Sequence, residues 1–75
     1  MKITYDHKYN VSYIKLSESP KEIETIKISD EVNIDITPDG KIYGVELLNA
    51  NEQLKQNDEL IFLNEATGEE TKVAI

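Results

Sequence analysis

A chain of 75 residues is long enough for one domain, and a domain of this size buries only about 60% of the surface that its unfolded form exposes. It has no cysteine and no arginine, which excludes disulfides and zinc–thiolate sites and removes the guanidinium fork that reads guanine or clamps phosphate. Fifteen acidic residues against eight lysines give a net charge of −7, so we expect no binding to nucleic acid.

Hydropathy along the chain indicates a soluble protein in the cytoplasm, without a membrane partner. The N-terminal segment lacks the apolar run of a signal peptide, and no stretch approaches the roughly 20 apolar residues that span a bilayer. Residues 52–70 hold six acidic side chains against Lys55 alone. Such an excess is typical of a solvated face that keeps a small protein soluble, or of an acidic patch that attracts a basic partner.

The first third of the chain predicts three strands. Residues 2–5 and 11–16 are rich in β-forming side chains and are joined by a polar connection, which indicates a hairpin. A turn containing Pro20 follows, and alternating apolar residues in 23–29 predict the third strand.

The fourth strand and its turn give the clearest local pattern. Residues 32–36 alternate between aliphatic and polar side chains, which is the period of a strand with one wet face. In the turn that follows, Pro38 fixes φ at the first position. Asp39 tolerates the backbone conformation of the second position, and Gly40 is free to adopt positive φ.

The fifth strand needs one inserted residue. A three-residue loop pairs Ile36 with Ile42 on the apolar face, but an unbroken register beyond them turns Glu46 inward and Val45 outward. A β-bulge shared by Tyr43 and Gly44 returns Val45 to the apolar face. Both Gly40 and Gly44 then have backbone roles that need no ligand.

The same segment, residues 35–46, also has the spacing of a calcium loop. Asp35, Asp39 and Glu46 occupy its first, fifth and twelfth places. Thr37 stands where that loop carries Asp or Asn, Pro38 stiffens it, and its flanks have the period of strands instead of helices. We therefore interpret the segment as a hairpin and expect no metal site.

The pattern changes after residue 49. Residues 50–56 contain helix formers after a plausible N-cap, Asn49, and predict a helix of about two turns. An apolar run at 60–63, a turn-like 65–68 and a β-branched tail predict a C-terminal β-hairpin.

Together these elements predict an α+β fold: an antiparallel β-meander of about five strands, one short helix and a C-terminal β-hairpin. We expect a single domain over residues 1–75, with a core at 1–54 and an extension at 55–75. A single sheet with one apolar face needs a cover, so we expect either the extension to fold over it or two copies to form a homodimer.

No catalytic constellation is evident. His7 is the single histidine and lies in the first turn with Asp6, and neither it nor Asp39 has the apolar surroundings that separate the pKa values of an acid and a base. We therefore expect no enzyme activity and no cofactor.

Four tyrosines are many for so short a chain, and they are candidate interface residues because tyrosine is enriched at protein contacts. Packing at the edge of the core is the simpler interpretation, with Tyr5 and Tyr13 as cross-strand neighbours. The four are Tyr5, Tyr9, Tyr13 and Tyr43.

The segments MKITYD, YIKLS and DGKIYGVELLNA resemble a family of small bacterial proteins known as domain of unknown function 2283, over about residues 1–54. The chain departs from the family pattern at Tyr9, Val11 and Ser12, and Ser12 weakens the apolar face of the second strand. The family has no established activity or catalytic residues. Some members accompany small toxin-like proteins, so the resemblance implies an antitoxin role by analogy.

These observations favour a non-enzymatic protein-interaction module, with an antitoxin-like role as neutralising partner of a small basic protein. One alternative is a small-molecule or ion-binding domain that uses the concave side of the sheet or the 35–46 loop. Another is an acidic anti-defence protein that mimics nucleic acid, although the sequence has no regular acidic array.

Overall fold

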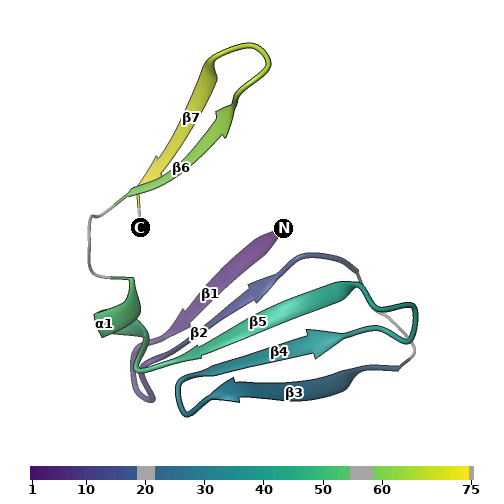
Figure 1. The fold of residues 1–75 in the computed structure, drawn as a ribbon. Helices are drawn as coiled ribbons and strands as arrows, with labels where there is room; N and C mark the ends of the chain where they lie inside the picture. Colours follow the sequence, from purple (N-terminus) through teal and green to yellow (C-terminus); the bar gives the residue numbers. More distant parts are fainter. Residues whose placement is uncertain (19–21, 55–58, 75) are drawn as a thin grey trace.

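The computed structural model describes residues 1–18, 22–54 and 59–74. In chain order the elements are β1 (Lys2–Asp6), β2 (Val11–Lys15), β3 (Glu24–Ser29), β4 (Val32–Ile36), β5 (Ile42–Leu48), α1 (Ala50–Gln53), β6 (Glu59–Asn64) and β7 (Glu69–Ala74). Antiparallel strands with one short helix confirm the expected fold class (Figure 1).

Five strands form one antiparallel sheet in the order β1-β2-β5-β4-β3. Strands β3, β4 and β5 follow one another as a meander, and β5 then pairs with β2 instead of forming an edge (Figure 1). The seven-residue β5 is the longest strand, and its central place gives hydrogen-bond partners to both of its edges.

The β4–β5 hairpin contains the extra residue that its apolar pattern requires. Ile36 pairs with Ile42, whereas the next pair is Asp35 with Gly44, so Tyr43 is the inserted residue. The insertion reverses the alternation of β5 after Tyr43. As a result, the aliphatic residues beyond the bulge lie on the same face as Ile36.

Strand register separates the sheet into two faces. The central row of one face has an aliphatic residue from each strand: Ile3, Ile14, Val45, Ile34 and Ile26. We call this row, its flanking residues Tyr5, Ser12, Leu47 and Val32, and the pair Ile36 and Ile42, the apolar face. A row of the opposite, polar face consists of Thr4, Tyr13, Glu46, Asn33 and Lys27.

Helix α1 is a single turn that ends at Gln53, so within the described residues it is shorter than the expected helix; residues 55 and 56 of that expectation lie outside the described ranges. Asn49 precedes the helix with φ 52° but makes no side-chain capping hydrogen bond. The helix therefore begins where expected, without the expected cap.

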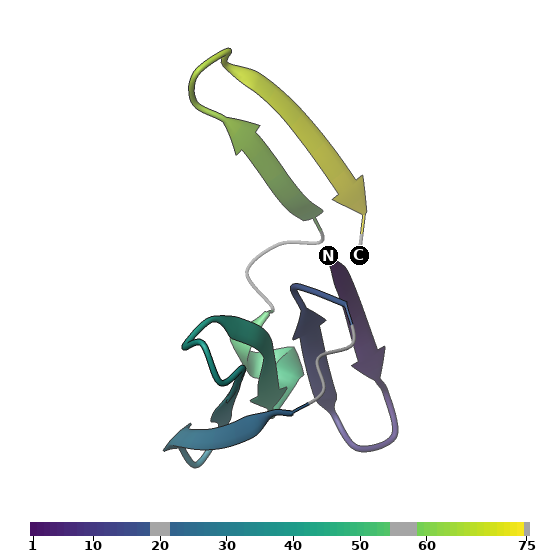
Figure 2. The same cartoon turned by 90° about the vertical axis from the view of Figure 1, so that its right-hand side faces the viewer.

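Strands β6 and β7 form the C-terminal hairpin and pair with each other. Figures 1 and 2 show this hairpin beyond the five-stranded sheet rather than over it. The expected folding of the C-terminal segment over the apolar face is thus not seen. Among the described residues, no helical segment has the length and hydropathy of a membrane span.

Candidate functional site

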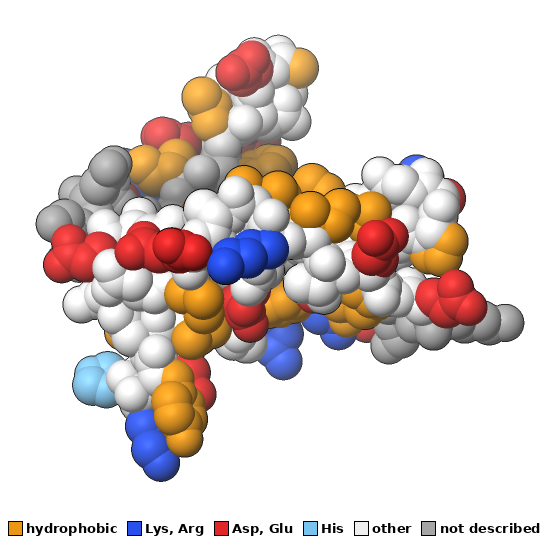
Figure 3. All heavy atoms as spheres, turned by 60° about the horizontal axis from the view of Figure 1, so that its bottom comes forward, with side chains coloured by type: hydrophobic (Ala, Val, Ile, Leu, Met, Phe, Trp, Pro, Cys, Tyr) orange, Lys and Arg blue, Asp and Glu red, His pale blue; other side chains and the backbone are white. Residues whose placement is uncertain are grey.

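The apolar face is exposed at its edges and half-buried at its centre. Ile3 and Ile26, at the two ends of its central row, are 38% and 39% exposed, and Ile42 and Tyr5 are 45% and 47% exposed. The inner residues of the row are half-buried. Hydrophobic side chains also reach the surface beside carboxylates in the view of Figure 3. A water-exposed aliphatic surface of this extent is typical of an interaction site.

Ser12 interrupts the apolar face without leaving an unpaired polar group. Its side chain is fully buried, and its hydroxyl donates a hydrogen bond to the carbonyl oxygen of Thr4 at 2.8 Å. A satisfied hydroxyl avoids the cost of a buried unpaired donor, so the face stays effectively apolar at this position.

The polar face carries a hydrogen-bond network centred on Asp35. The Tyr13 hydroxyl donates to one carboxylate oxygen at 2.6 Å, and the Thr25 hydroxyl donates to the other at 2.5 Å. Burial, and then the hydrogen bond to Asp35, raise the pKa of Tyr13 well above its ordinary value. This network links β2, β3 and β4 across β5, which is a structural role.

Gly44 lies beneath the ring of Tyr13. A Cβ added at Gly44 would stand 2.5 Å from Cζ of Tyr13 and closer still to its hydroxyl oxygen. Gly44 is therefore required by a side chain from the neighbouring strand, in addition to its place in the bulge. This reason could not be derived from the sequence, because it depends on the β2–β5 pairing.

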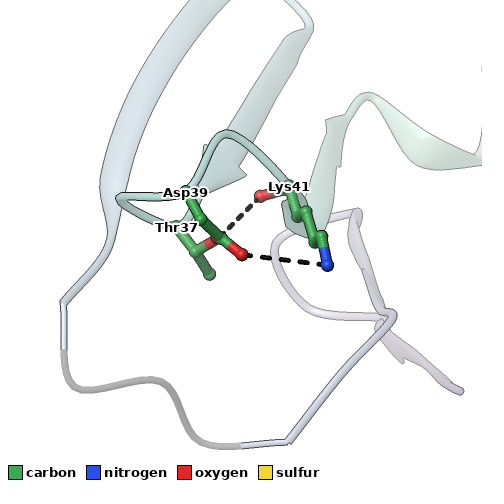
Figure 4. Close-up of polar contacts among 3 residues, drawn as sticks. All are labelled: Thr37, Asp39 and Lys41. Atoms are coloured by element: carbon green, nitrogen blue, oxygen red, sulfur yellow. Dashed lines mark hydrogen bonds and ion pairs between the residues drawn. The ribbon is translucent and has the colours of Figure 1, made fainter.

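The β4–β5 turn is closed by its own side chains (Figure 4). The Thr37 hydroxyl donates to the Asp39 carboxylate, and Lys41 Nζ lies 3.9 Å from the second Asp39 oxygen. The hydrogen bond from Thr37 is the main reason why the pKa of Asp39 is below its ordinary value. Gly40 has φ 83°, and its N–H donates to the Thr37 carbonyl oxygen at 2.9 Å, so Pro38 to Gly40 form a three-residue loop.

The carboxylates with calcium-loop spacing do not converge. Asp35 and Glu46 accept hydrogen bonds from side chains on the polar face, whereas Asp39 belongs to the turn. Within residues 1–18, 22–54 and 59–74, no group of three or more potential metal ligands lies together. The flanks of the loop are strands, not the helices of an EF-hand.

Asn10 holds α1 onto the sheet. Its carbonyl oxygen accepts the N–H of Ala50 and its side-chain oxygen accepts the N–H of Asn51, both at 2.9 Å, while its amide donates to Asn49. Asn10 and Asn49 both have positive φ, at 56° and 52°. Asn10 thus performs the capping role expected of Asn49. The sequence signal was only that asparagine tolerates this conformation.

The four candidate tyrosines do not form one cluster. Tyr5 pairs with Ser12 and so lies on the apolar face, whereas Tyr13 lies on the polar face, so the expected Tyr5–Tyr13 contact is wrong. The Tyr13 ring instead lies 6.5 Å from that of Tyr43. Tyr9, in the β1–β2 turn, is 67% exposed.

Of the residues considered for catalysis, Asp6 ends β1, and His7 and Asp39 lie in turns. Asp6 accepts hydrogen bonds from the backbone N–H groups of Lys8 and Tyr9, at 2.9 and 3.2 Å. The ring of His7 packs edge-on against Tyr5 with centroids 6.1 Å apart. Neither contact brings a carboxylate or a nucleophile to His7.

The β6–β7 hairpin is a second exposed surface, both apolar and acidic. Ile61, Phe62 and Leu63 are 45%, 64% and 51% exposed. Residues 59–74 contain four glutamates against Lys72 alone. An isolated two-stranded hairpin is only marginally stable in water.

Comparison with known proteins gives a match to the five-stranded sheet but not to the β6–β7 hairpin. A family model described as "protein of unknown function (DUF2283)" matches residues 2–51, which span β1 to the start of α1. No curated protein and no solved structure matches the chain significantly. Strands β6 and β7 lie outside the matched residues.

Proposed function

This chain belongs to the DUF2283 family of proteins of unknown function, and we propose that it is a non-enzymatic protein-interaction module. Because that family carries no activity to transfer, the proposal depends on the surfaces of this chain. We further propose an antitoxin-like role, in which it neutralises a small basic protein. The observation that carries this proposal is the exposed, acidic and apolar β6–β7 hairpin.

The chemistry of the hairpin suits a basic partner with apolar residues. Leu60, Phe62 and Val73 lie on one face of the hairpin by register, and Ile61 and Leu63 lie on the other. The glutamates at and near the Glu65–Gly68 turn attract lysine and arginine and speed their encounter. Burial of the exposed apolar side chains then supplies affinity that charge alone does not.

A pull-down from an extract of the native host tests the proposal. The full chain is compared with a variant in which Glu65, Glu69 and Glu70 are glutamine, which keeps size and turn geometry but removes three charges. We expect the wild type to capture a small basic protein at low salt, and the variant to capture less of it. Recovery of no protein at any salt concentration would contradict the proposal.

The identity of the captured protein separates a neutralising role from simple adhesion. Its gene is expressed alone and with this chain, and growth of the host is followed. Growth inhibition that co-expression relieves, and that the Phe62→Ser variant relieves less, supports an antitoxin-like role. A partner whose expression leaves growth unchanged removes the neutralising role but keeps the interaction module. A calcium titration that raises the melting temperature would instead favour the ion-binding alternative.

A further inference from the structure

The chain exposes more surface than a compact protein of its mass. Its accessible area is 6028 Å², whereas a compact folded monomer of 8.6 kDa has about 4700 Å². The surplus of roughly 1300 Å² exceeds the ~800 Å² that each partner buries in a standard protein interface. Compared with a compact monomer of the same mass, one copy therefore has enough additional accessible area for a stable interface.

A second copy of the chain could cover the apolar face. Its central row has five aliphatic residues and no charge, and Val45 of the middle strand β5 stands at its centre. Its neighbouring row from Tyr5 to Ser29 is also uncharged. A two-fold contact needs a surface that complements itself, and uncharged aliphatic rows meet this condition.

We propose that the apolar face of one chain packs against the apolar face of a second copy, as two sheets about 10 Å apart with Val45 near the two-fold axis. A net charge of −7 on each copy opposes association, but the two uncharged rows keep carboxylates away from the centre of the contact, and Glu24, which pairs with Ile36, lies at the edge of the same face. The two uncharged rows offer no charge to the basic partner of the proposed function. The apolar face is a different surface from the hairpin, so this dimer does not depend on the proposed function.

Ile3→Lys and Thr4→Lys form a matched pair for testing the contact. The two residues are neighbours on the edge strand β1, both are exposed, and their side chains lie on opposite faces of the sheet. Each substitution adds one positive charge, but only Ile3→Lys places it in the proposed interface. Two-fold symmetry doubles the effect, because each contact receives two unpaired charges.

Sedimentation of the full-length chain, from micromolar to millimolar concentration, measures the association. We expect a wild-type dimer, a Kd raised by roughly a hundredfold in Ile3→Lys, and little change in Thr4→Lys. Circular dichroism verifies that each variant is folded, and Ile26→Lys on β3 repeats the test if Ile3→Lys unfolds. A wild type that stays monomeric at every concentration overturns the proposal, as does equal weakening by Ile3→Lys and Thr4→Lys.

Salt dependence separates this dimer from an ionic complex. Two copies of like charge should associate more tightly as salt rises, because screening reduces their repulsion. Binding of a basic protein to the acidic hairpin should weaken under the same change. Dissociation of the dimer by added salt would therefore contradict an apolar contact.

Discussion

Replacing Gly44 with alanine should destabilise the protein by about 2 kcal/mol, because the new methyl group needs space that the Tyr13 ring occupies. The added Cβ would lie 2.5 Å from Cζ of Tyr13. Relieving the overlap moves the ring and breaks the 2.6 Å hydrogen bond from the Tyr13 hydroxyl to Asp35. Gly44 lies outside the positive-φ region, so backbone strain adds nothing to this effect.

The magnitude follows from three effects. Overpacking costs about 1–3 kcal/mol. A lost hydrogen bond to a carboxylate costs about 1.5–3 kcal/mol, and it overlaps with the overpacking because the same ring movement causes both. Loss of unfolded-chain entropy on replacing glycine returns about 0.4–1 kcal/mol. For a domain of this size, about 2 kcal/mol lowers the Tm by roughly 8–16 °C.

Urea unfolding followed by circular dichroism, at one fixed protein concentration, measures the change. The matched test is the same substitution in a Tyr13→Thr background, where the ring is absent. There Gly44→Ala should be neutral or stabilising by up to about 1 kcal/mol. A cost below about 0.5 kcal/mol in the wild type, or the same cost in both backgrounds, would refute the steric explanation.

Three further predictions concern Tyr13, Asn10 and Thr37. The folded-state pKa of Tyr13 is raised above its unfolded value near 10, so the stabilising effect of its neutral hydroxyl is complete below about pH 10 and declines above that pH. Unfolding free energies measured as the pH rises past about 10 should therefore fall more steeply for the wild type than for Tyr13→Phe. Asn10→Gly keeps the positive φ but loses the helix cap and should cost about 1 kcal/mol, with Asn10→Ala costing about 1–2 kcal/mol more; equal losses in thermal unfolding would exclude the φ effect. Thr37→Val should raise the pKa of Asp39 toward its ordinary value in an NMR titration, because the hydrogen bond from Thr37 is lost. The stabilising effect of this carboxylate, which is present above its unfolded pKa, should then be lost at a higher pH as acid is added. An unchanged pKa would show that Thr37 is not the main cause.

Surface roles were harder to derive from the sequence than the fold. The acid excess of the C-terminal third and the need for a cover over one apolar face were both evident from composition and alternation. Their separation into two surfaces was not, because the position of the hairpin beyond the sheet depends on the folded chain (Figure 1). The tyrosines illustrate the same limit, since a one-residue difference in register places Tyr5 and Tyr13 on opposite faces.

Local pattern was sufficient for the strands, the three-residue turn and the inserted residue near Gly44, because side-chain alternation and turn chemistry act between residues close in the chain. The place of β5 between β2 and β4, the capping of α1 by Asn10, and the seat of the Tyr13 ring over Gly44 needed the folded chain. The β2–β5 pairing, the Asn10 cap and the Tyr13 contact join residues 29 to 41 positions apart, and a period-2 pattern carries no record of which strand becomes the neighbour.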